Sequence, residues 1–148
     1  MASKDAEARE AWACILRMFL SPETHDSFHT ACAEIGLPHP GSLKALLQLD
    51  AIDPPSMREM AEGLHCDASY ITGLVDALED QGYVERRVSP IDRRVKLVQL
   101  TDTGLAARAR AVEVMGQPPK GFEALSATDT RNLAKLLAKV ADDYPELT

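Results

Sequence analysis

The chain has 148 residues, of which 45% are hydrophobic and 26% are charged, a composition typical of a globular domain with one hydrophobic core. The 23 acidic and 16 basic residues give a formal net charge of −7, which excludes a protein that binds nucleic acid through its overall charge. No apolar run approaches the roughly 20 residues of a membrane-spanning helix. Charges interrupt the first residues, where a secretion signal needs an apolar stretch. We therefore expect a cytoplasmic protein without membrane contact.

The first third of the chain has the periodicity of α-helices. Apolar residues recur every three or four positions over residues 4–20, which predicts an amphipathic helix. Ser21 and Pro22 are suited to the N-cap and first position of a second helix, expected over 22–34. The turn-rich segment 36–41 then separates this helix from a short, mostly buried helix over 42–50.

Two short helices follow in close succession. Ser56 and Glu59 have the spacing of a capping box, which opens the first of them. Asp67 is a suitable N-cap for the second, and Gly82 is placed to end it. Only residues 64–67 join the two helices, so the pair is predicted to form a helix-turn-helix.

The next segment changes to the pattern of a β-hairpin. Residues 83–88 and 93–100 are rich in β-branched side chains, and the turn-forming segment 89–92 contains a proline that favours a projecting loop. A further helix is expected over 103–115, followed by a break and by a last helix capped by Ser126. The fold class is therefore mainly α with a small β-hairpin wing, in a single domain over residues 1–148.

A helix-turn-helix followed by a hairpin is the winged-helix arrangement, in which the second helix is suited to reading DNA. A helix of about 10–12 Å diameter fits a major groove about 12 Å wide, and its first turns meet the base edges. We expect Ser69, Tyr70 and Thr72 to supply hydrogen-bonding groups there, and the Thr72 methyl to suit a thymine methyl.

The hairpin carries a local positive charge that the whole chain lacks. Residues 85–96 contain five cations and two acids, a net charge of +3, which predicts phosphate contacts at this loop. An arginine at the tip suits a narrow minor groove, and Asp92 is spaced to brace Arg94. A charged edge that only prevents aggregation is the alternative, but the adjoining helix pair favours DNA. The predicted DNA-binding residues are Ser56, Ser69, Tyr70, Thr72, Arg86, Arg87, Asp92, Arg93, Arg94 and Lys96.

From Ser56 to Gly104 the chain resembles the MarR family of winged helix-turn-helix transcriptional regulators. The matching segments are MAEGL at 60–64, ITGLVDALEDQGYVER at 71–86, DRR at 92–94 and LTDTG at 100–104. The resemblance implies a sequence-specific regulator of double-stranded DNA, which we expect to be a repressor. It also places Asp92 and Arg94 in the structure and minor-groove contact of the wing. Gly73 departs from the pattern, because many members have an arginine there.

The resemblance further implies a homodimer on a pseudo-palindromic operator. Its interlocked dimerisation helices would occupy residues 1–36 and 103–148, and its DNA-binding part residues 37–102. The prolines at 22 and 118–119 shorten helices that run longer in typical members, which leaves the dimer geometry and operator spacing open.

Family members commonly release DNA when they bind a small aromatic acid, when a cysteine is oxidised or, in a few cases, when a metal binds. We expect a small aromatic effector in a cleft between the terminal helices and the winged helix. Its predicted lining is Trp12, Leu16, Phe19 and Phe28.

Three alternatives stay open. Cys14 could act as a redox switch, although nothing except Arg17 is placed to lower the pKa of its thiol. His25, His29 and Cys32 share one helix face and could form a metal site. A winged helix used for protein–protein assembly would suit the net negative charge. No phosphate loop, nucleophile elbow or HExxH motif is present, so we expect neither an enzyme nor a cofactor.

Overall fold

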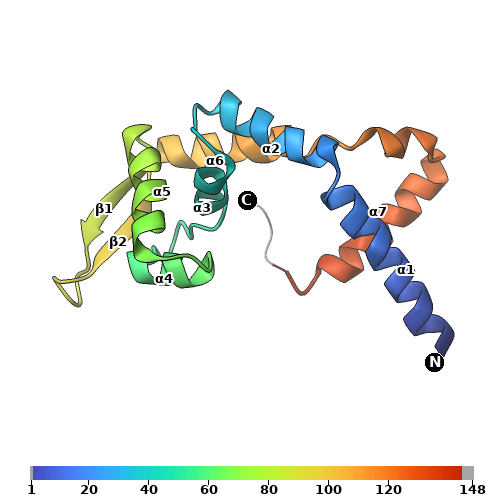
Figure 1. Cartoon of the computed structure of the whole chain (residues 1–148), viewed down its shortest axis with the longest axis horizontal. Helices are drawn as coiled ribbons and strands as arrows, with labels where there is room; N and C mark the ends of the chain where they lie inside the picture. The colour runs from blue at the N-terminus through green and yellow to red at the C-terminus, as the bar shows by residue number, and fades with distance from the viewer. Residues whose placement is uncertain (1, 145–148) are drawn as a thin grey trace. The chain divides into compact units, whose positions relative to one another are not determined.

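The computed structural model describes residues 2–144 and is mostly helical (Figure 1). The described range contains seven α-helices, one 3₁₀ helix and one two-stranded antiparallel hairpin, which confirms the expected fold class. The elements are α1 (Ala2–Phe19), α2 (Pro22–Glu34), α3 (Pro40–Leu47), α4 (Met57–Gly63), α5 (Ala68–Asp80), β1 (Val84–Val88), β2 (Lys96–Leu100), α6 (Asp102–Met115), η1 (Lys120–Ala124) and α7 (Ala127–Ala141). No helix in this range is long and apolar enough to cross a membrane.

The described chain divides into two compact units. The terminal unit comprises residues 2–27 and 116–144, and the central unit comprises residues 28–115. The central unit therefore contains the second half of α2, residues 28–34, and all elements from α3 to α6.

The terminal unit consists mainly of α1 and α7. Ser126 caps α7 as predicted, because its hydroxyl oxygen accepts a hydrogen bond from the backbone N–H of Asp129 at 3.2 Å. The helical turn η1 lies where we predicted only a break. None of the described side chains of α1 or α7 is buried. Their apolar side chains are exposed instead, at Trp12, Leu16, Met18, Phe19, Leu136, Leu137 and Val140.

The central unit contains the hydrophobic core. Helix α5 contacts α3, α4 and β1, and its apolar stripe is the middle of this core. The largest fully buried side chains are Leu43, Leu46, Ile71, Leu74, Val75, Leu78 and Val98. Tyr83 adds a polar anchor, because its hydroxyl donates to the carbonyl oxygen of Ile35 at 2.6 Å. The core thereby holds α5 with one face inward and the other in solvent.

The predicted caps of the helix-turn-helix are confirmed. Ser56 and Glu59 form the complete capping box of α4. The Asp67 carboxylate accepts from the backbone N–H of Tyr70 at 2.8 Å and caps α5. At the other end, Gly82 adopts a φ of +74°, which a residue without Cβ reaches at no steric cost. The first turn of α5, which sequence reasoning assigned to base reading, is therefore fixed locally.

The turn between α4 and α5 contains an unpredicted feature. His65 adopts a φ of +52°, a conformation uncommon for residues other than glycine but more frequent for histidine, asparagine and aspartate. The backbone N–H of His65 donates to the carbonyl of Glu62 at 3.2 Å, and that of Cys66 to the carbonyl of Ala61 at 3.0 Å. These bonds end α4 as a Schellman motif and turn the chain sharply into α5.

The hairpin pairs β1 with β2 in an antiparallel register from Val84 opposite Leu100 to Val88 opposite Lys96. A third short segment joins it, which we did not predict. Ser56 forms a β-bridge with Leu97, and the backbone N–H of Val98 donates to the carbonyl of Pro55 at 2.8 Å. The wing is thus attached directly to the start of α4.

The bounds of one helix differ from the expectation. We predicted a helix over 42–50, whereas α3 runs from Pro40 to Leu47. It begins earlier because His39 acts as its N-cap, with Nδ1 accepting from the backbone N–H of Gly41 at 3.1 Å, and because Pro40 is favourable at the first helical position.

Candidate nucleic-acid interface

Helix α5 presents one continuous exposed face. Ser69, Thr72, Gly73 and Asp76 are all exposed, and their spacing places them on the same side of the helix. The opposite side is buried at Ile71, Leu74, Val75 and Leu78. The exposed face begins at the capped N-terminus, which is the end that enters the major groove in helix-turn-helix proteins.

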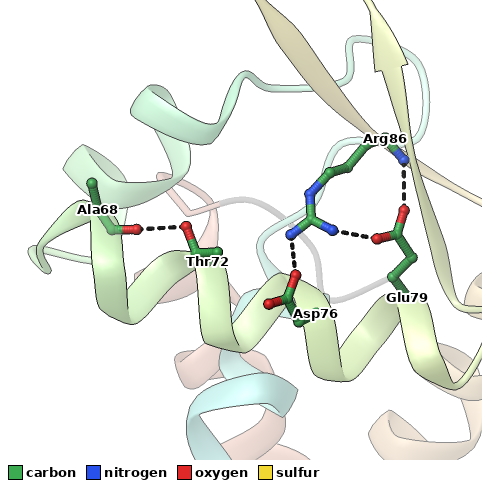
Figure 2. A network of polar contacts seen from close by, with 5 residues as sticks. All are labelled: Ala68, Thr72, Asp76, Glu79 and Arg86. Atoms are coloured by element: carbon green, nitrogen blue, oxygen red, sulfur yellow. Dashed lines mark hydrogen bonds and ion pairs between the residues drawn. The ribbon is translucent and has the colours of Figure 1, made fainter.

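The structure refines the expected role of Thr72. Its hydroxyl donates to the carbonyl oxygen of Ala68 at 2.7 Å (Figure 2). The hydroxyl proton is therefore committed within the helix, and the side chain offers DNA its methyl group and the acceptor lone pairs of its oxygen. Tyr70 is also partly engaged, because its ring stacks on His39 with a centroid separation of 6.4 Å and is 50% exposed.

Ser56 takes part mainly in local structure. Its hydroxyl donates to Oε2 of Glu59 at 2.7 Å and accepts from the backbone N–H of Glu59 at 3.2 Å. The hydrogen bonds from Ser56 hold the pKa of the Glu59 carboxyl below its ordinary value. The hydroxyl proton of Ser56, one of the predicted DNA-binding residues, is thus used in the capping box.

The tip of the wing has the predicted brace. Oδ1 of Asp92 accepts from the backbone N–H of Arg94 at 3.0 Å and from its Nε at 3.2 Å, and Oδ2 accepts from a terminal nitrogen of the same guanidinium at 3.2 Å. These bonds lower the pKa of Asp92, with the guanidinium as the largest cause. The Arg94 side chain remains 90% exposed, so its charge faces solvent in a preset orientation.

The other wing cations differ in how much charge they leave available. Arg93 and Lys96 are exposed and form no ion pair with another residue in the described range 2–144. Arg87 is exposed but pairs with Glu85 on the same strand.

Arg86 lies differently from the expectation. Its side chain is only 19% exposed, and it forms ion pairs with Asp76 at 2.5 Å and with Glu79 (Figure 2). Sequence reasoning missed both carboxylates. The two-residue period of a strand places Arg86 on the same side as the buried Val84, which is the signal that could have identified its inward orientation.

The predicted effector residues lie on two elements. Trp12, Leu16 and Phe19 are exposed on α1 in the terminal unit, whereas Phe28 is half-buried against the core of the central unit. Cys14 is also exposed on α1.

The three residues considered as an alternative metal face do not come together as ligands. His25 and His29 are exposed on α2, but Cys32 is buried in the core, and burial raises the pKa of its thiol. Among residues 2–144 no group of three His, Cys, Asp or Glu side chains could hold a metal ion.

Comparison with known proteins places this geometry in a family. The MarR family model matches residues 40–96, from α3 to the first residue of β2. The chain is 27% identical over 124 residues to the organic hydroperoxide resistance transcriptional regulator of Bacillus subtilis, covering 84% of this chain and 83% of that protein. It spans 59% and 60% of the lengths of two further curated relatives.

Solved structures agree. The transcriptional repressor CouR bound to a 23-mer DNA duplex has a TM-score of 0.61 at 30% identity, covering 86% of this chain and 89% of that chain. CouR from Rhodococcus jostii RHA1 bound to p-coumaroyl-CoA has a TM-score of 0.55 at 28% identity, covering 90% and 92%. These relatives are named as regulators or repressors of transcription. Together with the match across the helix-turn-helix and hairpin, they show that the chain belongs to the MarR family of DNA-binding transcriptional regulators.

Proposed function

We propose that the chain is a cytoplasmic repressor that binds a pseudo-palindromic operator, with α5 in the major groove and the wing tip in the minor groove. The observation that carries this proposal is the Asp92-braced, 90% exposed Arg94 on a loop that follows the exposed face of α5. A braced guanidinium loses less conformational entropy when it docks. The similar transcriptional repressor CouR, whose structure holds a 23-mer DNA duplex, supports binding to double-stranded DNA.

The proposed repressor is a homodimer, with residues 1–36 and 103–148 as its dimerisation segments and 37–102 as its DNA-binding part. Support comes from α1 and α7, whose apolar side chains are exposed in the single chain, among them Trp12, Phe19 and Val140. Neighbouring exposed apolar residues on helices are typical of a surface that another chain covers.

A small aromatic effector is proposed to weaken operator binding. The complex of CouR with p-coumaroyl-CoA supports a small organic ligand. Trp12, Leu16 and Phe19 on α1 are the proposed contacts, because aromatic and aliphatic surfaces suit such a ligand.

Operator binding as a function of salt tests the DNA-binding roles. A duplex selected from random DNA by the purified protein is the probe. Arg94→Ala should weaken binding to all sequences and lower the salt slope by about one unit, whereas Ser69→Ala should relax preference at one base pair by about 1–3 kcal/mol. Arg9→Ala, an exposed cation on α1, is the matched control and should change neither. Binding without salt dependence, or an equal effect of all three variants, would contradict the assigned roles and favour a protein-assembly module.

A redox switch at Cys14 is a second candidate. The exposure of Cys14 on α1 and the similarity to an organic hydroperoxide resistance regulator favour it. Treatment with an organic hydroperoxide should then abolish operator binding by the wild-type protein but not by Cys14→Ser. Equal responses of the two proteins would exclude this switch.

A further inference from the structure

We infer that Arg86 is a positioning residue that fixes wing strand β1 on the DNA-reading helix α5 through Asp76 and Glu79. The inference rests on the proposed function and deepens it. It replaces the direct DNA contact that the sequence suggested for Arg86 with an internal role.

The geometry of Arg86 is that of a clamp. One terminal guanidinium nitrogen pairs with Asp76 at 2.5 Å and the other with Glu79 (Figure 2). Oε1 of Glu79 also accepts from the backbone N–H of Arg86 at 3.2 Å. Glu79 therefore holds both the main chain and the side chain of one strand residue, and Asp76 holds the same guanidinium one helical turn earlier.

Burial separates Arg86 from the other wing cations. Its side chain is 19% exposed, against 63% for Arg87 and 90% for Arg94. Both terminal nitrogens already bond a carboxylate, and the two carboxylates offset the positive charge that would attract a phosphate. The residue is thus poorly placed to contact DNA and well placed to set the angle between β1 and α5.

The position of Asp76 gives the clamp a second effect. Asp76 lies on the exposed face of α5 with Ser69, Thr72 and Gly73, where an unpaired carboxylate would repel DNA phosphates. Pairing with Arg86 offsets that charge and uses it to orient the wing. The structure therefore predicts that this acidic residue on the DNA-facing side favours operator binding.

The direction in which operator affinity changes when the negative charge is removed tests this prediction. Removing a negative charge near DNA strengthens binding if only electrostatics acts. If Asp76 positions the wing, Asp76→Asn and Glu79→Gln should each weaken binding to the selected duplex by roughly tenfold, the loss expected when a coupled pair is broken. Asp80→Asn is the matched control, because Asp80 is an exposed acid on the last turn of α5; it should leave affinity unchanged or raise it slightly.

Arg86→Gln separates positioning from a phosphate contact and from simple loss of fold. It should weaken operator binding with an unchanged salt slope, retain binding to random DNA, and show little additional loss when combined with Asp76→Asn. A slope lower by about 0.9 would identify a phosphate contact. An equal loss for operator and random DNA, with a lower unfolding temperature, would identify a merely structural role. A lower salt slope, an equal loss on both DNAs, or tighter binding by Asp76→Asn would each refute the positioning role of Arg86 and leave the proposed function intact. A wild-type protein that binds no duplex would refute the proposed function as well.

Discussion

Replacing Gly104 with alanine should destabilise the central unit, because the added carbon would meet a backbone atom. An ideal Cβ at Gly104 lies 2.0 Å from the carbonyl oxygen of Tyr83, where carbon–oxygen contacts are normally at least about 3.3 Å. Neither the Tyr83 carbonyl nor the start of α6 can move away easily. The Tyr83 carbonyl accepts from the backbone N–H of Thr101 at 3.1 Å, and the Thr101 hydroxyl bonds both Gly104 and Gly82.

The expected magnitude follows from two opposing effects. Overpacking of this severity costs about 3 kcal/mol, the upper part of the usual range. Alanine regains about 1 kcal/mol over glycine within a helix, which leaves a net loss of about 2 kcal/mol. Gly73 provides the matched control, since its ideal Cβ has no atom within 4 Å apart from its chain neighbours and the backbone of its own helix; Gly73→Ala should stabilise the protein by about 1 kcal/mol.

Urea unfolding followed by far-ultraviolet circular dichroism gives both values from the transition midpoints. The protomer concentration must be the same throughout, because assembly contributes to apparent stability. Gly104→Ala at least as stable as the wild-type protein would refute the close approach of α6 to the Tyr83 carbonyl. Equal effects at both glycines would show that helix propensity alone determines the result.

Three further predictions concern the DNA-facing surface. Gly73→Arg has open space on the exposed face and should tighten duplex binding and steepen the salt slope by about 0.9 for each phosphate gained; an unchanged slope would place position 73 away from the phosphates. Thr72→Val keeps the methyl group and loses only a hydroxyl already bonded to Ala68, so operator affinity should change less than for Thr72→Ala, and the reverse order in a binding titration would show that the hydroxyl reads DNA. The lowered pKa of Asp92 means that its brace on Arg94 adds stability above the ordinary aspartate range and loses it as the pH falls through the lowered value; NMR shifts of the Arg94 Nε–H should follow that acidic titration and not change near neutral pH.

Local signals predicted much of the fold. The caps at Ser56, Asp67 and Ser126 depend on residues three positions away, and the brace from Asp92 to Arg94 depends on residues two positions away. Interactions over such short spacings are visible in the sequence, because the chain cannot place the partners far apart.

The misses arose where partners are distant or where burial decides the role of a side chain. Arg86 lies ten residues from Asp76, and its orientation depends on which face of β1 packs on α5. The bridge from Ser56 to Leu97 spans the whole helix-turn-helix. At Cys32, helical spacing correctly placed the residue on the same helix as two histidines, but the demands of the core buried its thiol. Sequence spacing predicts which side of a helix a residue faces, but it does not predict how deeply the side chain is buried.

The exposed helices α1 and α7 make the activity of this protein depend on its concentration. Helices that bury none of their own described side chains have little of the tertiary packing that stabilises most helices in proteins. Under the proposed dimer, ordering of these segments and pairing of two chains become one concentration-dependent equilibrium. Doubling synthesis in a dilute cell would then more than double the population able to occupy an operator, and solitary chains would be the form most open to proteolysis.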